Sequence, residues 1–287
     1  KSPKTAIVNR NVDHFGYRQD QLHAEEIPLA TIAERVGTPC YVYSRATLER
    51  HYRVFDDAFG DWPHHICFAV KANGNLAVLQ VLERLGAGFD IVSMGELDRV
   101  LASGGRAADV VFSGVGEPSD ESVQALRAGV RVLSIESGQE LDRVNAVALA
   151  ANTTAPVAFR INPDVDPKTH PYIATGLREN KFGVPAADAL ALYRKADAMA
   201  GIEVAGIGCH IGSQLTEVDP FCDALEKVLD LVEALAQNGI TLQHLDLGGG
   251  VGLRYSDETP PDPKDYAQAK LAILKRRNCN LSVTLEP

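Results

Sequence analysis

One stretch of the sequence runs His64-His-Ile-Cys-Phe-Ala-Val-Lys71-Ala-Asn-Gly-Asn75. Before the lysine, large apolar side chains alternate with smaller ones, which is the two-residue period of a β-strand. The Asn and Gly residues after Lys71 favour a turn. Leucines at helical spacing begin at Leu76, and Gly86 stands where a helix C-cap glycine belongs. The stretch therefore predicts a strand that presents a lysine at its end, followed by a helix.

A lysine at the end of a buried strand loses hydration, which lowers the pKa of its amine and raises the neutral, nucleophilic fraction. Such an amine can form a Schiff base with a carbonyl compound. The alternative for Lys71 is a side chain that simply reaches from the strand end into solvent. The rest of the chain favours the first interpretation.

The alternation of a short apolar strand with a helix continues to the end of the chain. We expect eight strands, at 64–71, 89–92, 110–112, 131–135, 157–161, 204–209, 242–247 and 281–285. Each strand but the last is followed by a helical pattern, which is the count of a (β/α)8 TIM barrel in the α/β class. A doubly wound open sheet is the alternative, but eight regular units without an evident reversal favour closure. The segment 162–183 is too long for a simple connector and is expected to be functional or disordered.

The first part of the chain, up to about residue 45, does not follow this rhythm. Short strands are expected at 14–17 and 41–43, with a helix between them at 29–36. Because the first residue is not Met, we expect the sequence to be trimmed at its start, and also at its end.

The composition excludes several classes of protein. The 287 residues carry a formal charge of −10 and a pI near 5.3, which argues against a general affinity for nucleic acid or an anionic membrane. No apolar run is long enough to span a bilayer, and no signal-peptide core follows the first residues. The five cysteines show no zinc-binding spacing, so a reducing cytoplasm fits best.

In barrels of this kind, the active site lies at the C-terminal ends of the strands. The residues at those ends are Lys71, Asp90, Ser113, Glu136, Arg160, His210, Gly248-Gly249-Gly250 and Glu286. Nearly all are ionisable, hydrogen-bonding or glycine, where chance would give a mixture with apolar residues. For Asp90, Ser113 and Glu136 taken singly, a helix cap or a solvated strand end explains the residue equally well.

Three of these features belong together chemically. Glycines 248–250 follow the seventh strand, where barrels commonly hold a phosphate on backbone N–H groups, although a turn without a ligand is the alternative. His210 is either a structural residue or a group that stacks on a ligand or handles a proton. A lysine able to form a Schiff base, a phosphate cradle and a carboxylate at Glu286 point to pyridoxal phosphate. An anion beside the pyridine nitrogen keeps that nitrogen protonated, which strengthens the ring as an electron sink.

Five motifs carry a family resemblance over essentially the whole chain. They are Phe68-Ala-Val-Lys-Ala-Asn73, Phe89-Asp-Ile-Val-Ser-Met-Gly-Glu96, Gly208-Cys-His-Ile-Gly-Ser-Gln214, Leu247-Gly-Gly-Gly250 and Leu285-Glu-Pro287. Together they resemble the fold-type III pyridoxal-phosphate decarboxylases. The stretches 170–183 and 27–43 favour the branch that acts on meso-diaminopimelate over the ornithine and arginine decarboxylases.

The resemblance implies roles for individual residues. Lys71 is expected to form the Schiff base, His210 to stack on the cofactor ring, and Glu286, with Pro287 beside it, to face the pyridine nitrogen. The phosphate is expected on Ser213, Gly248, Gly249 and Gly250. Asp90 and Arg160 match positions that line the cofactor pocket. Lys71, His210 and Glu286 are the expected catalytic residues, and no metal is expected.

The resemblance also implies an activity and an assembly. The expected reaction is loss of CO2 from the D-centre carbon of meso-diaminopimelate, which gives L-lysine. Residues 1–45 are expected to contribute to a β-domain and 46–287 to form the barrel. The family motif continues beyond Pro287 into that β-domain, with substrate-binding residues and a catalytic cysteine, so none of the cysteines present is assigned that role. A homodimer with shared active sites is expected. The alternatives are a decarboxylase of another amino acid on the same fold and a non-catalytic homologue that binds the cofactor.

Overall fold

The structure is a computed structural model that describes residues 13–114, 119–166, 175 and 182–287. The chain forms two compact units, Lys1–Val54 and Phe55–Pro287. Helix α2 (Arg45–Phe59) crosses from the first unit into the second.

The first unit contains a small antiparallel sheet of β1 (Phe15–Arg18), β2 (Gln21–Ala24) and β3 (Ile27–Pro28), followed by α1 (Leu29–Val36). Helix α1 has the bounds that the sequence predicts. The strand predicted at 41–43 is wrong, because no strand of the described residues 13–54 pairs with it and Tyr41 is 91% exposed. An alternating pattern makes a strand only where a neighbouring strand can accept its backbone hydrogen bonds.

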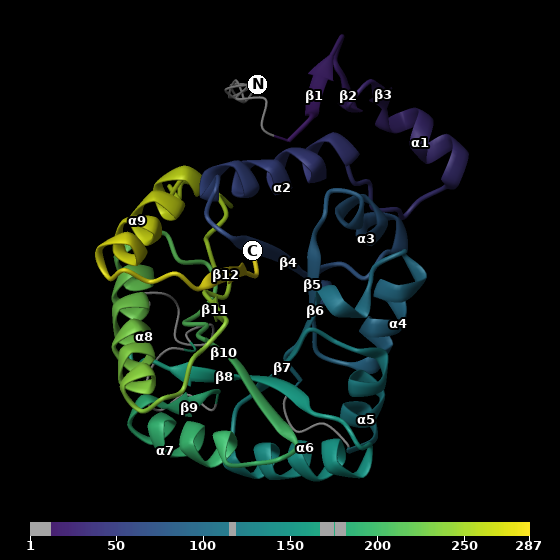
Figure 1. Cartoon of the computed structure of the whole chain (residues 1–287). Coiled ribbons are helices and arrows are strands. Elements are labelled where there is room, and N and C mark those ends of the chain that lie inside the picture. The colour runs from purple at the N-terminus through teal and green to yellow at the C-terminus, as the bar shows by residue number, and fades with distance from the viewer. Residues whose placement is uncertain (1–12, 115–118, 167–174, 176–181) are drawn as a thin grey trace. The chain divides into compact units, whose positions relative to one another are not determined.

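The second unit is a closed parallel barrel of eight strands, viewed along the barrel in Figure 1. The strands are β4 (His64–Ala69), β5 (Gly88–Ile91), β6 (Val110–Phe112), β7 (Val132–Ile135), β8 (Ala155–Asn162), β10 (Ile202–Gly208), β11 (His244–Asp246) and β12 (Ser282–Leu285). Each pairs in parallel with its neighbours, and the ring is closed by β12 against β4 and by β8 against β10. The sequence prediction of eight strands in a closed (β/α)8 barrel is confirmed, and a two-residue strand, β9 (Val184–Pro185), adds to the edge of β8.

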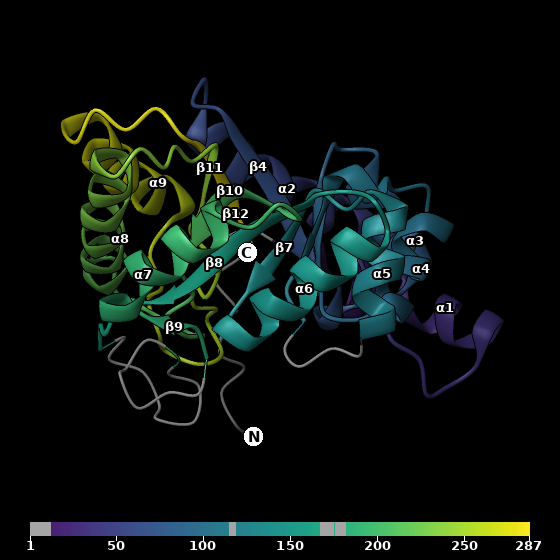
Figure 2. The ribbon, with the colours of Figure 1, turned by 60° about the horizontal axis from the view of Figure 1, so that its bottom comes forward.

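Helices cover the outside of the barrel, as Figures 1 and 2 show. They are α3 (Leu76–Glu83), α4 (Met94–Ala102), α5 (Ser119–Ala128), α6 (Gly138–Ala150), α7 (Ala186–Asp197), α8 (Asp219–Gln237) and α9 (Pro263–Arg276). The two capping boxes in the sequence start α4 and α6, where the hydroxyls of Ser93 and Ser137 accept hydrogen bonds from the backbone N–H groups of Glu96 and Glu140. These caps fix where each strand ends and its helix begins.

Inside the barrel, two histidine side chains fill the space that glycines leave open on the neighbouring strands. His65 occupies the space beside Gly88, and His244 occupies the space beside Gly206, so a Cβ on either glycine would overlap the imidazole ring. Small apolar residues form a further cluster in the core: Cys67, Val111, Val132, Ala158 and Ala205.

The described part of the chain contains no helix that combines the length and the apolar character needed to cross a membrane.

Candidate active site

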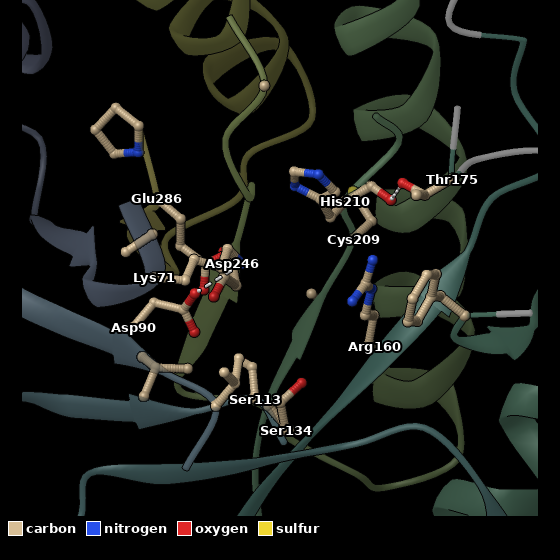
Figure 3. A pocket seen from close by; sticks show the side chains of 18 of the residues that line it. Lys71, Asp90, Ser113, Ser134, Arg160, Thr175, Cys209, His210, Asp246 and Glu286 are labelled. Carbon is tan, nitrogen blue, oxygen red and sulfur yellow. Dashed lines mark hydrogen bonds and ion pairs between the residues drawn. The ribbon is translucent and has the colours of Figure 1, made fainter. Parts of the chain in front are cut away.

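A cavity of about 630 Å³ opens at the C-terminal ends of the barrel strands (Figure 3). The residues lining it that the sequence assigns to the cofactor are Lys71, Asp90, Arg160, His210, Ser213, Gly250, Glu286 and Pro287. Gly248 and Gly249 do not line it. Six lining residues with polar or bulky side chains were not singled out from the sequence: Ser134, Thr175, Phe182, Cys209, His244 and Asp246.

Lys71 lies in a short 3-10 helix, η1 (Val70–Ala72), that directly follows β4. Its side chain is 63% exposed, and its Nζ lies 3.5 Å from Asp90 Oδ2. The expectation that strand burial desolvates this amine is wrong, because β4 ends at Ala69 and η1 carries the side chain to the open cavity. A neighbouring carboxylate and access to solvent define the surroundings of the amine.

Asp90 is 2% exposed on β5, where it pairs in register with Ala69 of β4. Burial raises the pKa of its carboxyl group, and the Lys71 ammonium and the Ser113 hydroxyl act in the opposite direction. Its Oδ1 has no hydrogen-bond partner among the residues that the structure describes. A buried acceptor of this kind on a cavity wall can receive a donor from a ligand.

Asp246, the last residue of β11, and Glu286, just after β12, place two more carboxyl groups in the cavity wall. Burial raises the pKa of Asp246 to about 6 and raises that of Glu286 well above its usual range. The two carboxyl groups act on each other: Asp246 raises the pKa of Glu286, whereas Glu286 lowers that of Asp246. Burial and the neighbouring carboxyl groups therefore favour the neutral form of Glu286.

The glycine turn after β11 is built by close backbone packing. The Gly248 N–H donates to Asp246 Oδ1 at 2.7 Å, and the Glu286 N–H donates to the Gly248 carbonyl oxygen at 2.9 Å. A Cβ on Gly249 would overlap the carbonyl oxygen of Glu286, and one on Gly250 would overlap that of Gly212. The positive φ of Gly248 and Gly250 is a second reason for glycine there. The fold itself therefore requires these glycines, and Gly250 is the one that reaches the cavity.

His210 follows β10 and is held from two sides. The Gly249 N–H lies 3.4 Å from its Nδ1, and Thr175 Oγ1 donates to its carbonyl oxygen at 2.9 Å. Burial lowers the pKa of the imidazole to about 3, and the positive charges of Arg160, Lys71 and Lys270 contribute in the same direction. The ring is therefore neutral near pH 7, with Nδ1 as the acceptor and the proton assigned to Nε2. A neutral ring favours the stacking role over a charged proton donor.

Arg160, on β8, occupies the wall opposite the carboxyl groups, as Figure 3 shows. Its Nη1 donates to Glu136 Oε1 at 3.0 Å, and its guanidinium lies 5.0 Å from the centroid of the Phe182 ring. The second oxygen of Glu136 accepts the Gly183 N–H at 2.9 Å. Glu136 therefore positions Arg160 and does not line the cavity itself.

The cavity thus has an acidic wall of Asp90, Asp246 and Glu286 with the Lys71 amine beside it, and a cationic wall at Arg160 (Figure 3). A ligand with a carbonyl group, a ring nitrogen and an anionic group finds a complementary partner for each. The sequence marked Lys71, Asp90 and Glu286 by their positions at strand ends. Asp246 could have been found as an acidic side chain near the end of a predicted strand.

The comparisons with known proteins agree with this site. Residues 45–287 match the family model described as "Pyridoxal-dependent decarboxylase, pyridoxal binding domain". The diaminopimelate decarboxylase of Haemophilus influenzae is 52% identical over 276 residues, which are 96% of this chain and 66% of that protein. The diaminopimelate decarboxylase of Pseudomonas aeruginosa is 55% identical over the same shares.

Solved structures give the same result. The crystal structure of diaminopimelate decarboxylase from Helicobacter pylori complexed with L-lysine superposes with a TM-score of 0.87 at 38% identity, over 90% of this chain and 65% of that one. The chain therefore spans just under two thirds of the length of these relatives. Most of the 170–183 stretch that favours this branch lies outside the described residues.

Proposed function

This chain belongs to the pyridoxal-dependent decarboxylases, and we propose that the protein removes CO2 from meso-diaminopimelate to give L-lysine. The observation that carries the proposal is the Lys71 amine, open to the cavity and 3.5 Å from Asp90. It occurs in a chain more than half identical to two diaminopimelate decarboxylases. The Helicobacter pylori relative was solved with L-lysine, which is the product this reaction would leave.

The residues present fit pyridoxal phosphate. The Lys71 amine is exposed in the cavity and can react with an aldehyde, and Asp90 Oδ1 is a buried acceptor without a partner among the described residues. Burial and the neighbouring Asp246 raise the pKa of Glu286, which lines the same cavity and can face a ring nitrogen. Gly250 and Ser213 line the same cavity and would hold the phosphate.

When bound, pyridoxal phosphate supplies an electron sink for the bond between the substrate α-carbon and its carboxylate. Lys71 would hold the cofactor through its amine, and the same amine could carry a proton within the cavity. Asp90 would keep that amine in place. Glu286 would hold a proton at the ring nitrogen, and neutral His210 would orient the ring by stacking on it. Arg160 would attract an anionic group on the far wall.

The whole protein is proposed to act in the cytoplasm as a homodimer with shared active sites. In this proposal residues 1–45 contribute to a β-domain, together with sequence of the kind that the longer relatives carry. Residues 46–287 are the cofactor-binding barrel.

The experiment is a substrate comparison on the complete gene product loaded with pyridoxal phosphate. We expect CO2 release from meso-diaminopimelate at a kcat/KM at least about a hundredfold above that for ornithine, arginine or lysine. Lys71→Ala should abolish both the visible absorbance of the bound cofactor and CO2 release. Lys264→Ala, which removes an exposed lysine at the start of α9, is the matched control and should leave both unchanged.

Each other result selects an alternative. A preference for ornithine, arginine or lysine would identify a decarboxylase of another amino acid. Cofactor binding through Lys71 without CO2 release from any of them would identify a non-catalytic homologue. An unchanged absorbance in Lys71→Ala would remove the cofactor assignment itself.

A further inference from the structure

The turns that follow β10 and β11 are joined to each other by backbone hydrogen bonds beyond the ends of the two strands. The Leu215 N–H donates to the Gly250 carbonyl oxygen at 2.9 Å, and the Leu215 carbonyl oxygen accepts the Gly252 N–H at 2.8 Å. Leu215 and Val251 thus pair as an isolated parallel bridge. The two turns therefore form one unit at the mouth of the barrel.

Gln214 extends this bridge outward with its side chain. Its Nε2 donates to the Leu253 carbonyl oxygen, and its Oε1 accepts the Leu253 N–H at 2.9 Å. In the described part of the chain, residues 254–262 form hydrogen bonds only among themselves and with the start of α9. Among the described residues, the Gln214 amide is therefore the outermost hydrogen-bonded link between the two turns.

The backbone of Gln214 indicates that its side chain is needed. Its φ is +59°, in the left-handed region that glycine adopts freely and that strains most other residues. A turn that needed only this conformation would be formed more easily by glycine or asparagine. A strained residue persists where surrounding contacts fix it. Here those contacts are the two hydrogen bonds to Leu253.

From this geometry we propose that Gln214 is a positioning residue for the phosphate of the bound cofactor. Ser213 directly precedes Gln214, and Gly250 is bonded to Leu215, which directly follows it. Both Ser213 and Gly250 line the cavity. The clamp of Gln214 on Leu253 fixes the spacing of these two residues. This role rests on the proposed function, which seats the phosphate on them.

The spacing of the two turns affects the phosphate more than the rest of the ligand. A phosphate is held by several hydrogen-bond donors that must converge on it. If the two turns separate, these donors lose their common centre. Lys71 and Asp90 lie at η1 and β5, so their positions do not depend on the clamp. Loss of the clamp should therefore weaken the hold on the phosphate and spare the contacts to the aldehyde.

The test compares pyridoxal phosphate with pyridoxal, which has the same ring and aldehyde but no phosphate. Each ligand is titrated into the complete, cofactor-free protein, and its dissociation constant is taken from the visible absorbance of the bound form. Gln214→Gly and Gln214→Asn both tolerate the left-handed backbone. Glycine lacks the amide, and asparagine is one methylene too short to make both hydrogen bonds. We expect both variants to weaken pyridoxal phosphate binding on the order of tenfold and pyridoxal binding by less than about twofold.

Gln243→Asn is the matched control. Gln243 lies just before β11, and its Nε2 donates to Glu203 Oε1 at 3.1 Å, at the other end of the same two strands. The substitution shortens a hydrogen-bonded amide in the same way but far from the two turns. Both dissociation constants should therefore stay at the parent values.

Each other result counts against the proposal. Unchanged pyridoxal phosphate affinity in either Gln214 variant would overturn the role of Gln214 and leave the phosphate seat in place. An equal loss for both ligands would also overturn it, because the effect would then be on the barrel as a whole. A parent protein that binds both ligands equally would remove the phosphate seat of the proposed function, and the role of Gln214 with it. None of these measurements uses turnover, so a failure to decarboxylate meso-diaminopimelate would count only against the proposed activity.

Discussion

Replacement of Lys270 by methionine should stabilise the protein at neutral pH. Lys270 lies on α9 and is only 2% exposed. Its Nζ lies 4.3 Å from the centroid of the Tyr266 ring and 5.1 Å from that of Phe221. Methionine has a similar length and can fill the same space without a charge.

The magnitude follows from the pKa. Burial lowers the pKa of the Lys270 amine from 10.5 to about 8. At pH 7 the folded protein therefore keeps a buried charge at a cost of about 3 kcal/mol. The two aromatic rings offset about 1–2 kcal/mol of that cost through cation–π attraction. We expect Lys270→Met to raise the free energy of unfolding by about 1–2 kcal/mol at pH 7.

The sign of the pH dependence is fixed by the same values. Between about pH 8 and 10.5 the unfolded chain still binds the proton that the folded protein has released, so the stability of the parent rises with pH in this window. The advantage of Lys270→Met should therefore shrink as the pH rises from about 8 and vanish by about pH 10.5. Other titrating groups are common to both proteins and cancel in the difference.

The assay is urea unfolding of parent and variant at pH 7 and at about pH 10, with the free-energy difference taken at each pH. Lys264→Met, on the exposed surface of the same helix, is the matched control and should change stability by less than about 0.5 kcal/mol. Loss of stability in Lys270→Met at pH 7, or an equal effect at both pH values, would contradict a costly buried charge at this position.

Three further predictions concern the site and its supports. Gly249→Ala should destabilise the barrel and abolish cofactor binding, measured by melting temperature and absorbance, because its Cβ would overlap the Glu286 carbonyl oxygen; a stable variant that binds cofactor would contradict this. The free energy of unfolding of Glu140→Gln should rise by about 2–3 kcal/mol relative to that of the parent between about pH 4.5 and 7, because the folded parent keeps a proton on Glu140 that the unfolded chain releases. Parallel curves of unfolding free energy against pH for the two proteins would contradict this prediction. The imidazole NMR signals of His210 should show a neutral ring from pH 5 to 8, because its pKa is about 3; a titration near pH 6.5 would disprove its burial.

The barrel was predictable from the sequence because each of its units carries local signals. Alternating apolar residues mark the strands, and serine caps and terminal glycines mark the helix ends, as at Ser93 and Ser137. These signals act over a few residues and do not depend on the rest of the chain.

The surroundings of individual side chains were less predictable. Lys71 was placed in the strand because the alternation runs through Val70, but the backbone turns into η1 after Ala69 and exposes the amine. Asp246 and Glu286 lie in one cavity wall because β11 pairs with β12, although the two residues are 40 positions apart in the sequence. Tertiary contacts of this kind leave no periodic signal in the sequence.

The histidine on β11 has a consequence for the depth of the cavity. His244 lines the cavity from below and fills the gap left by Gly206 on the neighbouring strand. The floor of the cavity is thus the side chain of His244, which begins β11, two residues before the Asp246 carboxyl group on the same strand. A smaller residue in place of His244 would deepen the cavity, and a side chain added at position 206 would refill the space that the imidazole ring leaves. Neither change touches Lys71 or Asp90. This barrel therefore offers a way to alter which ligand lengths it admits independently of the groups that act on them.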